Sequence, residues 1–315
     1  KTMKLLVTGG AGFIGSNFIL YWSKNHPEDQ IVNLDKLTYA GNLENLKSIE
    51  DSSNYKFIKG DICDPSIVQK AMEGVDTIIH LACLSNAPSV GLDRGLSRSI
   101  NYNAFLKVLD AALTSGVKRF IYASSASVYG IKPDDVEVTE DLSLEPITDY
   151  SKFKVFCEME LRTLYGSEME WVIVRPAAVC GWSPRMRIDL AVNILTFAAL
   201  TKKKITVFGG EQKRPNIHIE DMADLYVRLI TEPSKRINGK VFNAGIDNLA
   251  VRDIALMVKA IVEGYYGENS VEIGTAYTDD RRSYRVSSEK IRRELGWAPK
   301  FEVKHAIRDL CEAFF

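Results

Sequence analysis

The chain has 315 residues, with 40 basic and 41 acidic side chains, so its formal net charge is −1. This balance gives no electrostatic reason to expect a nucleic acid or a membrane surface as a partner, and the longest basic run is Lys202–Lys204. No apolar stretch reaches the roughly 18 residues of a membrane span, and the N-terminus opens on a strand pattern rather than on a signal peptide. We therefore expect a cytoplasmic protein that is long enough for two lobes.

The cysteines and histidines do not form the pattern of a disulfide framework or a metal site. The five cysteines are odd in number, are scattered along the chain and form no C-x-x-C pair. The four histidines lack the spacing of metal ligands. We therefore expect neither disulfides nor a bound metal ion. The residues concerned are Cys63, Cys83, Cys157, Cys180 and Cys311, and His26, His80, His218 and His305.

A glycine-rich turn follows the first predicted strand. The apolar run Leu5–Val7 breaks into a G-x-x-G-x-x-G pattern formed by Gly9, Gly12 and Gly15. Glycines let the backbone approach a pyrophosphate closely, and the N–H groups at the start of the following helix can hold it. The second predicted strand, Ile31–Asp35, ends in a carboxylate that can accept hydrogen bonds from ribose hydroxyls. The pattern therefore predicts a dinucleotide site.

Strands and helices alternate as far as residue 175. We expect strands at Leu5–Val7, Ile31–Asp35, Tyr55–Ile58, Thr77–Leu81, Arg119–Ser124 and Trp171–Val174. We expect helices at Gly15–Asn25, near Leu43, after Asp64 as N-cap, at Ser97–Ser115 and at Tyr150–Tyr165. This alternation predicts an α/β fold with a doubly wound parallel sheet of the Rossmann type and right-handed crossovers.

The pattern becomes irregular beyond residue 176 and predicts a smaller α+β lobe. Helices are expected at Asp189–Leu200, Glu220–Thr231, Val251–Val262, Ser287–Leu295 and His305–Ala313, and short strands at Ile205–Val207 and Val241–Asn243. We expect residues 1–176 to bind the nucleotide cofactor and residues 177–315 to form mainly the substrate lobe, with some segments returning to the first domain.

Three polar residues are candidates for the chemistry. Ser125 follows the fifth predicted strand, at the carboxyl edge of the sheet where such folds bind ligands. Tyr150 and Lys154 are four residues apart, which places them on one helix face. A nearby ammonium lowers a phenol pKa from about 10 towards the working pH. The phenolate can then take a proton from a hydroxyl while hydride leaves the attached carbon.

In this order, the motifs resemble those of the extended short-chain dehydrogenases/reductases, in the nucleotide-sugar epimerase and dehydratase group. The resemblance covers nearly the whole chain and rests on T-G-G-A-G-F-I-G at 8–15, Asp35, G-D-I at 60–62, H-L-A at 80–82, S-S-A-S-V-Y-G at 124–130, Tyr150 with Lys154, R-P at 175–176 and the C-terminal D-R-R-S-Y-R-V-S…L-G-W. It implies that NAD stays bound, that Tyr150 is the acid/base, that Lys154 binds the nicotinamide ribose and that Ser125 hydrogen-bonds the sugar oxygen being oxidised.

The same resemblance implies the binding residues. Asp35 would hold the adenosine ribose and favour NAD over NADP, since a carboxylate repels a 2′-phosphate. Arg185, Arg187, Arg214 and Arg282 are candidates to clamp a diphosphate, and Arg214 and Arg282 match phosphate-contacting positions of the family. The expected cofactor-binding residues are Gly9, Gly12, Phe13, Ile14, Gly15, Asp35, Lys36, Asp61, Ile62, Leu81, Ala82, Tyr150 and Lys154. The expected substrate-binding residues are Ser85, Ser127, Arg185, Asn193, Arg214 and Arg282.

Two parts of the chain point to different reactions. The stretch 32–46 resembles dTDP-glucose 4,6-dehydratases, but those enzymes carry Thr-Asp-Glu where this chain has Ser125, Ala126 and Ser127. Dehydration needs an acid for the leaving hydroxyl and a base for the C5 proton, and alanine and serine supply neither. The segment 124–130 is similar instead to that of 4-epimerases. We therefore expect C4 inversion of a nucleotide-diphosphate hexose through a transient 4-keto intermediate.

Other functions stay open at this point. Within the family these are a 2-epimerase, a keto-sugar reductase and a nucleotide-diphosphate uronate decarboxylase or dehydratase. From another class, a non-catalytic NAD(H)-sensing regulator has the same fold, although it has no need of Ser125, Tyr150 and Lys154 together.

We also expect a homodimer. The helices expected at Ser97–Ser115 and Tyr150–Tyr165 carry more apolar residues than one core face requires, and two copies of the pair would form a four-helix contact, as the resemblance also implies. The apolar residues concerned are Leu106, Leu109, Leu113, Phe153, Phe156 and Met159.

Overall fold

The computed structural model describes residues 2–85, 87–133, 136–163, 169–184, 186–280 and 282–314. The chain forms two compact units. Unit 1 holds Lys1–Val128, Pro146–Arg175 and Ala223–Phe242, and unit 2 holds Tyr129–Glu145, Pro176–Met222 and Asn243–Phe315. Residues 129–145, which we expected in the first domain, thus cluster with unit 2. In the described part of the chain, every helix is too short or too polar for a membrane span.

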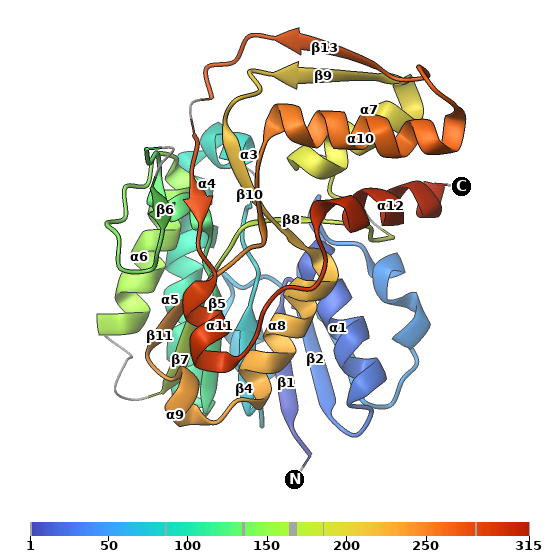
Figure 1. The fold of residues 1–315 in the computed structure, drawn as a ribbon. Coiled ribbons are helices and arrows are strands. Elements are labelled where there is room, and N and C mark those ends of the chain that lie inside the picture. The colour runs from blue at the N-terminus through green and yellow to red at the C-terminus, as the bar shows by residue number, and fades with distance from the viewer. Residues whose placement is uncertain are drawn as a thin grey trace. The chain divides into compact units, whose positions relative to one another are not determined.

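Unit 1 is built around a seven-stranded sheet in the order β11-β7-β5-β4-β1-β2-β3 (Figure 1). Neighbouring strands from β7 to β3 pair in parallel, which confirms the α/β doubly wound fold. The strand order reverses between β1 and β4, and open α/β sheets bind ligands outside the carboxyl ends of the strands at such a switch point. The strands are β1 (Lys4–Thr8), β2 (Gln30–Asp35), β3 (Tyr55–Lys59), β4 (Thr77–His80), β5 (Arg119–Ala123), β7 (Glu170–Pro176) and β11 (Lys240–Ala244).

Helices cover both faces of this sheet (Figure 1). On one face lie α1 and α8, where the rings of Phe18 and Tyr226 pack edge to face with their centroids 6.0 Å apart. On the other face, Phe105 of α5 and Leu161 of α6 are buried in one cluster with Leu6 of β1. Burying each such side chain contributes about 1.5–3 kcal/mol. The helices are α1 (Phe13–Asn25), η1 (Leu43–Ile49), α2 (Pro65–Ala71), α3 (Ala87–Leu92), α4 (Arg94–Arg98), η2 (Ser99–Asn103), α5 (Ala104–Thr114), η3 (Ala126–Tyr129), α6 (Asp149–Thr163), α8 (Ile219–Thr231) and α9 (Ser234–Ile237).

Our prediction of one continuous α-helix over Ser97–Ser115 was wrong. The structure has α3 and α4, then the π-helical turn η2, and only then α5. Within that turn, the side-chain amide of Asn101 accepts a hydrogen bond from the N–H of Leu84 at 2.7 Å and donates one to its C=O at 3.0 Å. The π turn thus brings a side chain to the loop after β4, and such turns are frequent at functional sites.

Two further expectations for unit 1 concern helix ends. Asp64 is the N-cap of α2, as expected, because its side chain accepts hydrogen bonds from the N–H groups of Ser66 and Ile67. The end expected at Tyr165 for the helix that carries Tyr150 lies outside the described residues.

Unit 2 consists of helices packed on small sheets. Its sheets have the orders β12-β10-β8, β13-β9 and β14-β6, and Leu195, Val258 and Ile307 join α7, α10 and α12 in one buried cluster. The helices expected beyond residue 176 exist, and the one expected at Glu220–Thr231 is α8, most of which lies in unit 1. Of the two expected strands, Ile205–Val207 is β9, and Val241–Asn243 is β11 of the seven-stranded sheet. Strands β6, β8, β10, β12, β13 and β14 were not expected. The elements are β6 (Glu137–Val138), β8 (Ala178–Cys180), α7 (Ala191–Lys202), β9 (Lys204–Phe208), β10 (Lys213–His218), β12 (Asp247–Ala250), α10 (Val251–Tyr266), β13 (Glu272–Ala276), β14 (Arg285–Val286), α11 (Glu289–Leu295) and α12 (Val303–Phe314).

Candidate active site

The glycine turn joins β1 to α1 and leaves no room for side chains. Gly9 has φ +72°, and a Cβ there would lie 2.9 Å from the backbone nitrogen of Ala82. A Cβ on Gly15 would lie 2.5 Å from the carbonyl oxygen of Gly9. Gly12 is the N-cap of α1 and provides no side-chain cap. The first N–H groups of α1 therefore keep their capacity to bind an anion.

A buried hydroxyl ties this turn to the end of β4. The Thr8 Oγ1 accepts hydrogen bonds at 3.2 Å from the N–H groups of both Leu81 and Ala82. Its own hydrogen therefore points to the Nδ1 of His80, 3.0 Å away. Burial, helped by the Lys154 charge, lowers the pKa of His80 to about 3, so the ring is neutral and accepts this bond. Leu81 and Ala82, both expected to line the cofactor, are thus fixed beside the glycine turn.

The carboxylate of Asp35 lies at the end of β2, as the sequence predicted. It accepts hydrogen bonds from the N–H groups of Ala11 at 3.0 Å and Leu37 at 2.8 Å, so it orders the turn that it borders. Lys36 and Asp61 form an ion pair at 2.6 Å. Burial acts to raise the pKa of Asp61, but the hydrogen bonds from Lys36 and Cys63, together with the Lys36 charge, outweigh burial and lower the pKa.

The groups of unit 1 fit a dinucleotide. The close-packed glycines, the uncapped start of α1 and the carboxylate after β2 supply the three features that a pyrophosphate and a ribose require. The side chains of Phe13 and Ile62 are buried in the core, so these two positions offer mainly backbone to a ligand, while Ile14 is half-buried.

Tyr150 and Lys154 lie together on α6, as their spacing predicted. The Lys154 Nζ is 5.6 Å from the centroid of the Tyr150 ring and donates a 2.6 Å hydrogen bond to the carbonyl of Ala123, the last residue of β5. Ser125 follows two residues later, and its Oγ is 2.9 Å from the Oγ of Ser127 and accepts from the Ser127 N–H at 3.1 Å. The lysine thus links the helix of the tyrosine to the strand that leads into the serines.

The Lys154 ammonium is held in its charged form although it is buried. Burial acts to lower the pKa of Lys154, but the negative charge that Cys83 and Tyr150 bear when ionised outweighs burial and raises the pKa. A permanent positive charge close to a phenol favours the phenolate. The arrangement therefore favours the phenolate form that a base requires.

A buried ion pair behind the serines was missed by sequence reasoning. Arg175, at the end of β7, donates to both carboxylate oxygens of Glu158 at 3.0 and 2.6 Å, and the two side chains are 2% and 1% exposed. The Ser124 Oγ donates to the same carboxylate. Glu158 and Arg175 are 17 positions apart, on a helix and a strand, so no spacing in the sequence signals this pair. The pair fixes the residue next to Ser125.

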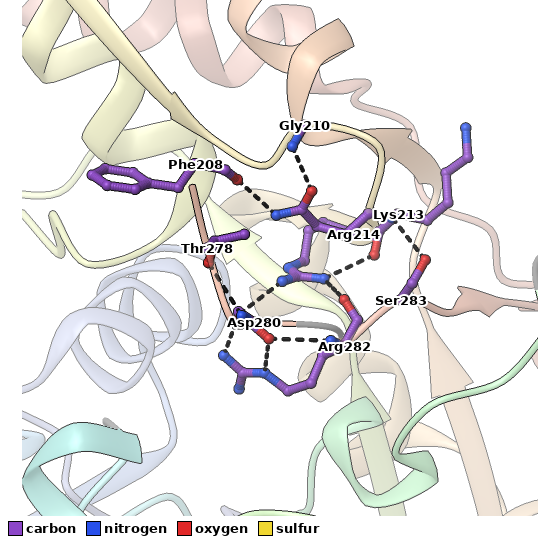
Figure 2. Close-up of polar contacts among 9 residues, drawn as sticks. Phe208, Gly210, Lys213, Arg214, Thr278, Asp280, Arg282 and Ser283 are labelled. Carbon is purple, nitrogen blue, oxygen red and sulfur yellow. Dashed lines mark hydrogen bonds and ion pairs between the residues drawn. The ribbon is translucent and has the colours of Figure 1, made fainter. Parts of the chain in front are cut away.

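In unit 2, two of the expected phosphate ligands meet at one carboxylate (Figure 2). Arg282 donates to Asp280 through Nε at 2.8 Å and Nη2 at 2.7 Å, and Arg214 donates to it through Nη2 at 2.9 Å. Burial acts to raise the pKa of Asp280, but the two arginines outweigh it and lower the pKa to about 2. The structure thus brings Arg214 and Arg282 together, and it adds Asp280, which sequence reasoning missed.

The other residues expected to bind substrate have contacts outside this cluster or lie outside the described residues. Asn193 is buried, and its amide accepts from the N–H of Gly181 and donates to the carbonyls of Gly181 and Arg187. These contacts order the loop before α7, so its side chain has a structural task. Arg187 is paired with Asp189 at 3.0 Å. Ser85 is half-buried in the loop after β4, and Arg185 lies outside the described residues.

A Rossmann-type sheet with a serine, a tyrosine and a lysine at its carboxyl edge defines a dinucleotide-dependent enzyme of the short-chain dehydrogenase/reductase class. A family model described as "NAD dependent epimerase/dehydratase family" matches residues 5–245. The chain therefore belongs to this family, whose cofactor is NAD, as the sequence predicted.

Relatives from both branches of the family are similar to this chain. The dTDP-glucose 4,6-dehydratase 1 of Escherichia coli is 31% identical over 98% of this chain and 92% of its own length. The dTDP-glucose 4,6-dehydratase of Bacillus anthracis, solved with NAD, has a TM-score of 0.87 at 26% identity, over 99% of this chain and 96% of that one. The UDP-glucose 4-epimerase of Thermotoga maritima, solved with UDP-glucose, has a TM-score of 0.87 at 25% identity, over 99% and 98% of the two chains.

Proposed function

We propose that the protein inverts C4 of a nucleotide-diphosphate hexose through a transient 4-keto intermediate. The observation that carries the proposal is the pair Ala126 and Ser127 beside Ser125. Ala126 is 1% exposed, and the Ser127 hydroxyl is hydrogen-bonded to the Ser125 hydroxyl. Neither side chain can protonate a leaving C6 hydroxyl or remove a C5 proton. Epimerisation needs neither step.

Tyr150 is the acid/base in this proposal. Its phenolate takes the proton of the C4 hydroxyl as that carbon is oxidised, and the phenol returns the proton after the keto sugar has turned over in the site. Lys154 favours the phenolate through its charge, and the Ser125 hydroxyl orients the oxygen that becomes the carbonyl. Bound NAD would supply the hydride acceptor and donor for the two half-reactions.

The experiment that tests the proposal follows sugar inversion without added cofactor. The purified protein is incubated with UDP-, dTDP-, GDP- and CDP-hexoses, and C4 configuration is followed by NMR, with Tyr150→Phe as the inactive control. We expect one nucleotide sugar to reach an equilibrium of two C4 epimers. Absence of inversion with every member of the panel would contradict the proposal.

A second candidate, 4,6-dehydration, is favoured by the similarity to dTDP-glucose 4,6-dehydratases over 98% of the chain. The same NMR experiment separates the two reactions, because dehydration yields a stable 4-keto-6-deoxy sugar. Formation of that product would overturn the epimerase proposal and make dehydratase the function.

For substrate recognition, we propose that Arg214 and Arg282 bind the diphosphate of the nucleotide sugar. Both guanidinium groups already bind the same anionic side chain, and guanidinium forks match phosphate oxygens as well as carboxylate oxygens. The two arginines and the one carboxylate leave one surplus positive charge. An anion with more charge than the carboxylate would neutralise both arginines.

We also propose that the protein is a homodimer that pairs through α5 and α6. On α6, Phe156 and Met159 are 46% and 56% exposed and lie three positions apart, which places two large apolar side chains on one exposed helix face. Leu109 of α5, which we expected at the contact, is instead buried in the core. Light scattering at micromolar concentration should give the mass of a dimer, and Phe156→Glu should shift it towards monomer. A monomeric unsubstituted protein would contradict the proposal.

A further inference from the structure

We propose that Asp280 is a specificity-determining residue that holds Arg214 and Arg282 as an internal counter-ion and yields them only to a ligand with the charge of a diphosphate. The inference rests on the proposal that the two arginines bind phosphate. It adds that Asp280 competes with the phosphate for them. The competitor belongs to the chain itself, in the segment between β13 and β14.

The contacts of Asp280 occupy the faces of the arginines that a phosphate would use. The Nε and Nη2 of Arg282 form a bidentate fork on the two oxygens of Asp280, at 2.8 and 2.7 Å. The Nη2 of Arg214 donates to the second of these oxygens at 2.9 Å. Figure 2 shows the carboxylate between the two guanidinium groups. A phosphate oxygen pair needs the same fork geometry, so it has to replace the carboxylate.

Further bonds hold Arg214 and the backbone of Asp280 without using that face, whereas the backbone N–H of Arg282 adds a bond to the carboxylate. The Nη1 of Arg214 donates to the carbonyl of Lys213 at 3.2 Å and to the carbonyl of Arg282. The backbone N–H of Arg282 donates to Asp280 at 3.1 Å, and the N–H of Asp280 donates to the Thr278 Oγ1 at 3.1 Å. When a ligand displaces the carboxylate, Arg214 therefore keeps its bonds to the two carbonyls, and Arg282 exchanges its bonds to Asp280 for bonds to the ligand.

Charge and exposure determine which ligands can make this exchange. Arg214 is 18% exposed, and burial lowers its pKa even though Asp280 raises it, so one shared carboxylate does not fully compensate the buried charge. Asp280 and Arg282 are 32% and 39% exposed, so a ligand can reach them from solvent. A singly charged anion gains little binding free energy when it replaces a carboxylate that is already bound. An anion with two or more charges neutralises both arginines and gains more.

The experiment measures the binding of inorganic pyrophosphate by calorimetry to the full-length protein and its variants. Asp280→Asn removes the competing charge and keeps the size of the side chain. The control is Asp279→Asn, because Asp279 is exposed, bonds Tyr277 at 2.6 Å and makes no arginine contact in the described part of the chain. Arg214→Gln and Arg282→Gln test the arginines themselves. Asp280→Ser removes the charge a second way if Asp280→Asn does not fold.

We expect Asp280→Asn to bind pyrophosphate about tenfold more tightly than the unsubstituted protein, the size expected for a unit charge in a partly screened contact. Asp279→Asn should bind as the unsubstituted protein does, and both arginine variants should bind more weakly. Equal or weaker binding by Asp280→Asn, with weakened arginine variants, would overturn the counter-ion role and leave the phosphate role of the arginines standing. Unchanged binding by the arginine variants would overturn both.

Discussion

The charged groups of the two units are held in different ways. In unit 1, Lys154 and the Glu158–Arg175 pair are buried and bonded to strand ends, so their positions are set by the fold itself. In unit 2, Arg214 and Arg282 are partly exposed and are paired with one shared carboxylate. Groups that must keep a fixed geometry for chemistry gain from burial, whereas groups that must bind and release a charged ligand gain from access to water. Substitutions in unit 1 should therefore affect turnover and stability, and those in unit 2 affinity.

The largest effect is expected for Tyr150→Phe. Loss of the phenolic proton carrier should lower turnover by roughly 10²–10⁴-fold, the range for a lost acid/base group. Bound NAD should stay, because the glycine turn and Asp35 are unchanged; release by denaturation and absorbance measures it. Loss of NAD together with turnover would mean that the tyrosine supports the cofactor site rather than the proton transfer.

The second effect concerns stability and the buried His80. Its pKa is lowered from 6.5 to about 3 in the folded protein, so below pH 6.5 the unfolded chain binds a proton that the folded one does not. Stability should therefore fall as the pH falls through this window, by about 3 kcal/mol down to about pH 4. In His80→Gln, urea denaturation should show a smaller loss over the same range.

The control for this measurement is His26→Gln, because His26 is only partly buried, in the turn after α1. It should keep the pH slope of the unsubstituted protein. An unchanged slope in His80→Gln would show that other groups carry the acid sensitivity.

The third effect is expected for Lys154→Met, which removes the charge beside Tyr150 and the bond to Ala123. A phenol pKa raised by about two units lowers the phenolate fraction, and with it turnover, about a hundredfold at neutral pH. The pH–rate profile should shift to higher pH, and NAD should be retained less well. Lys152→Met is the control, since the Lys152 side chain on the same helix is 45% exposed and pairs with Asp149. An unshifted profile would contradict the electrostatic role of Lys154.

The contrast between the units also explains what the sequence could predict. The glycine turn and the Tyr150–Lys154 pair are local, so spacing along one helix or turn was enough to predict them. The Thr8–His80 and Arg214–Asp280 contacts join residues 72 and 66 positions apart, and no periodicity links such partners. The missed strands of unit 2 are short, and β10 contains a proline and three basic residues, so alternation was not visible.

The smallest effect is expected for Arg282→Lys. This variant most directly separates ligand binding by unit 2 from the chemistry of unit 1. Lysine keeps the positive charge but cannot form the bidentate fork that Arg282 makes on Asp280, so a diphosphate should bind about tenfold more weakly. Turnover at saturating substrate should be nearly unchanged, because Tyr150, Lys154 and Ser125 are untouched. Initial rates over a range of substrate concentrations separate KM from kcat.

The control for Arg282→Lys is Arg292→Lys on α11, where the arginine is 65% exposed and paired with Glu289. It should leave both constants unchanged, because a surface ion pair contributes little. If Arg282→Lys lowered kcat and left KM unchanged, the arginine would act on the reacting centre. The assignment of chemistry to unit 1 and ligand exchange to unit 2 would then be wrong.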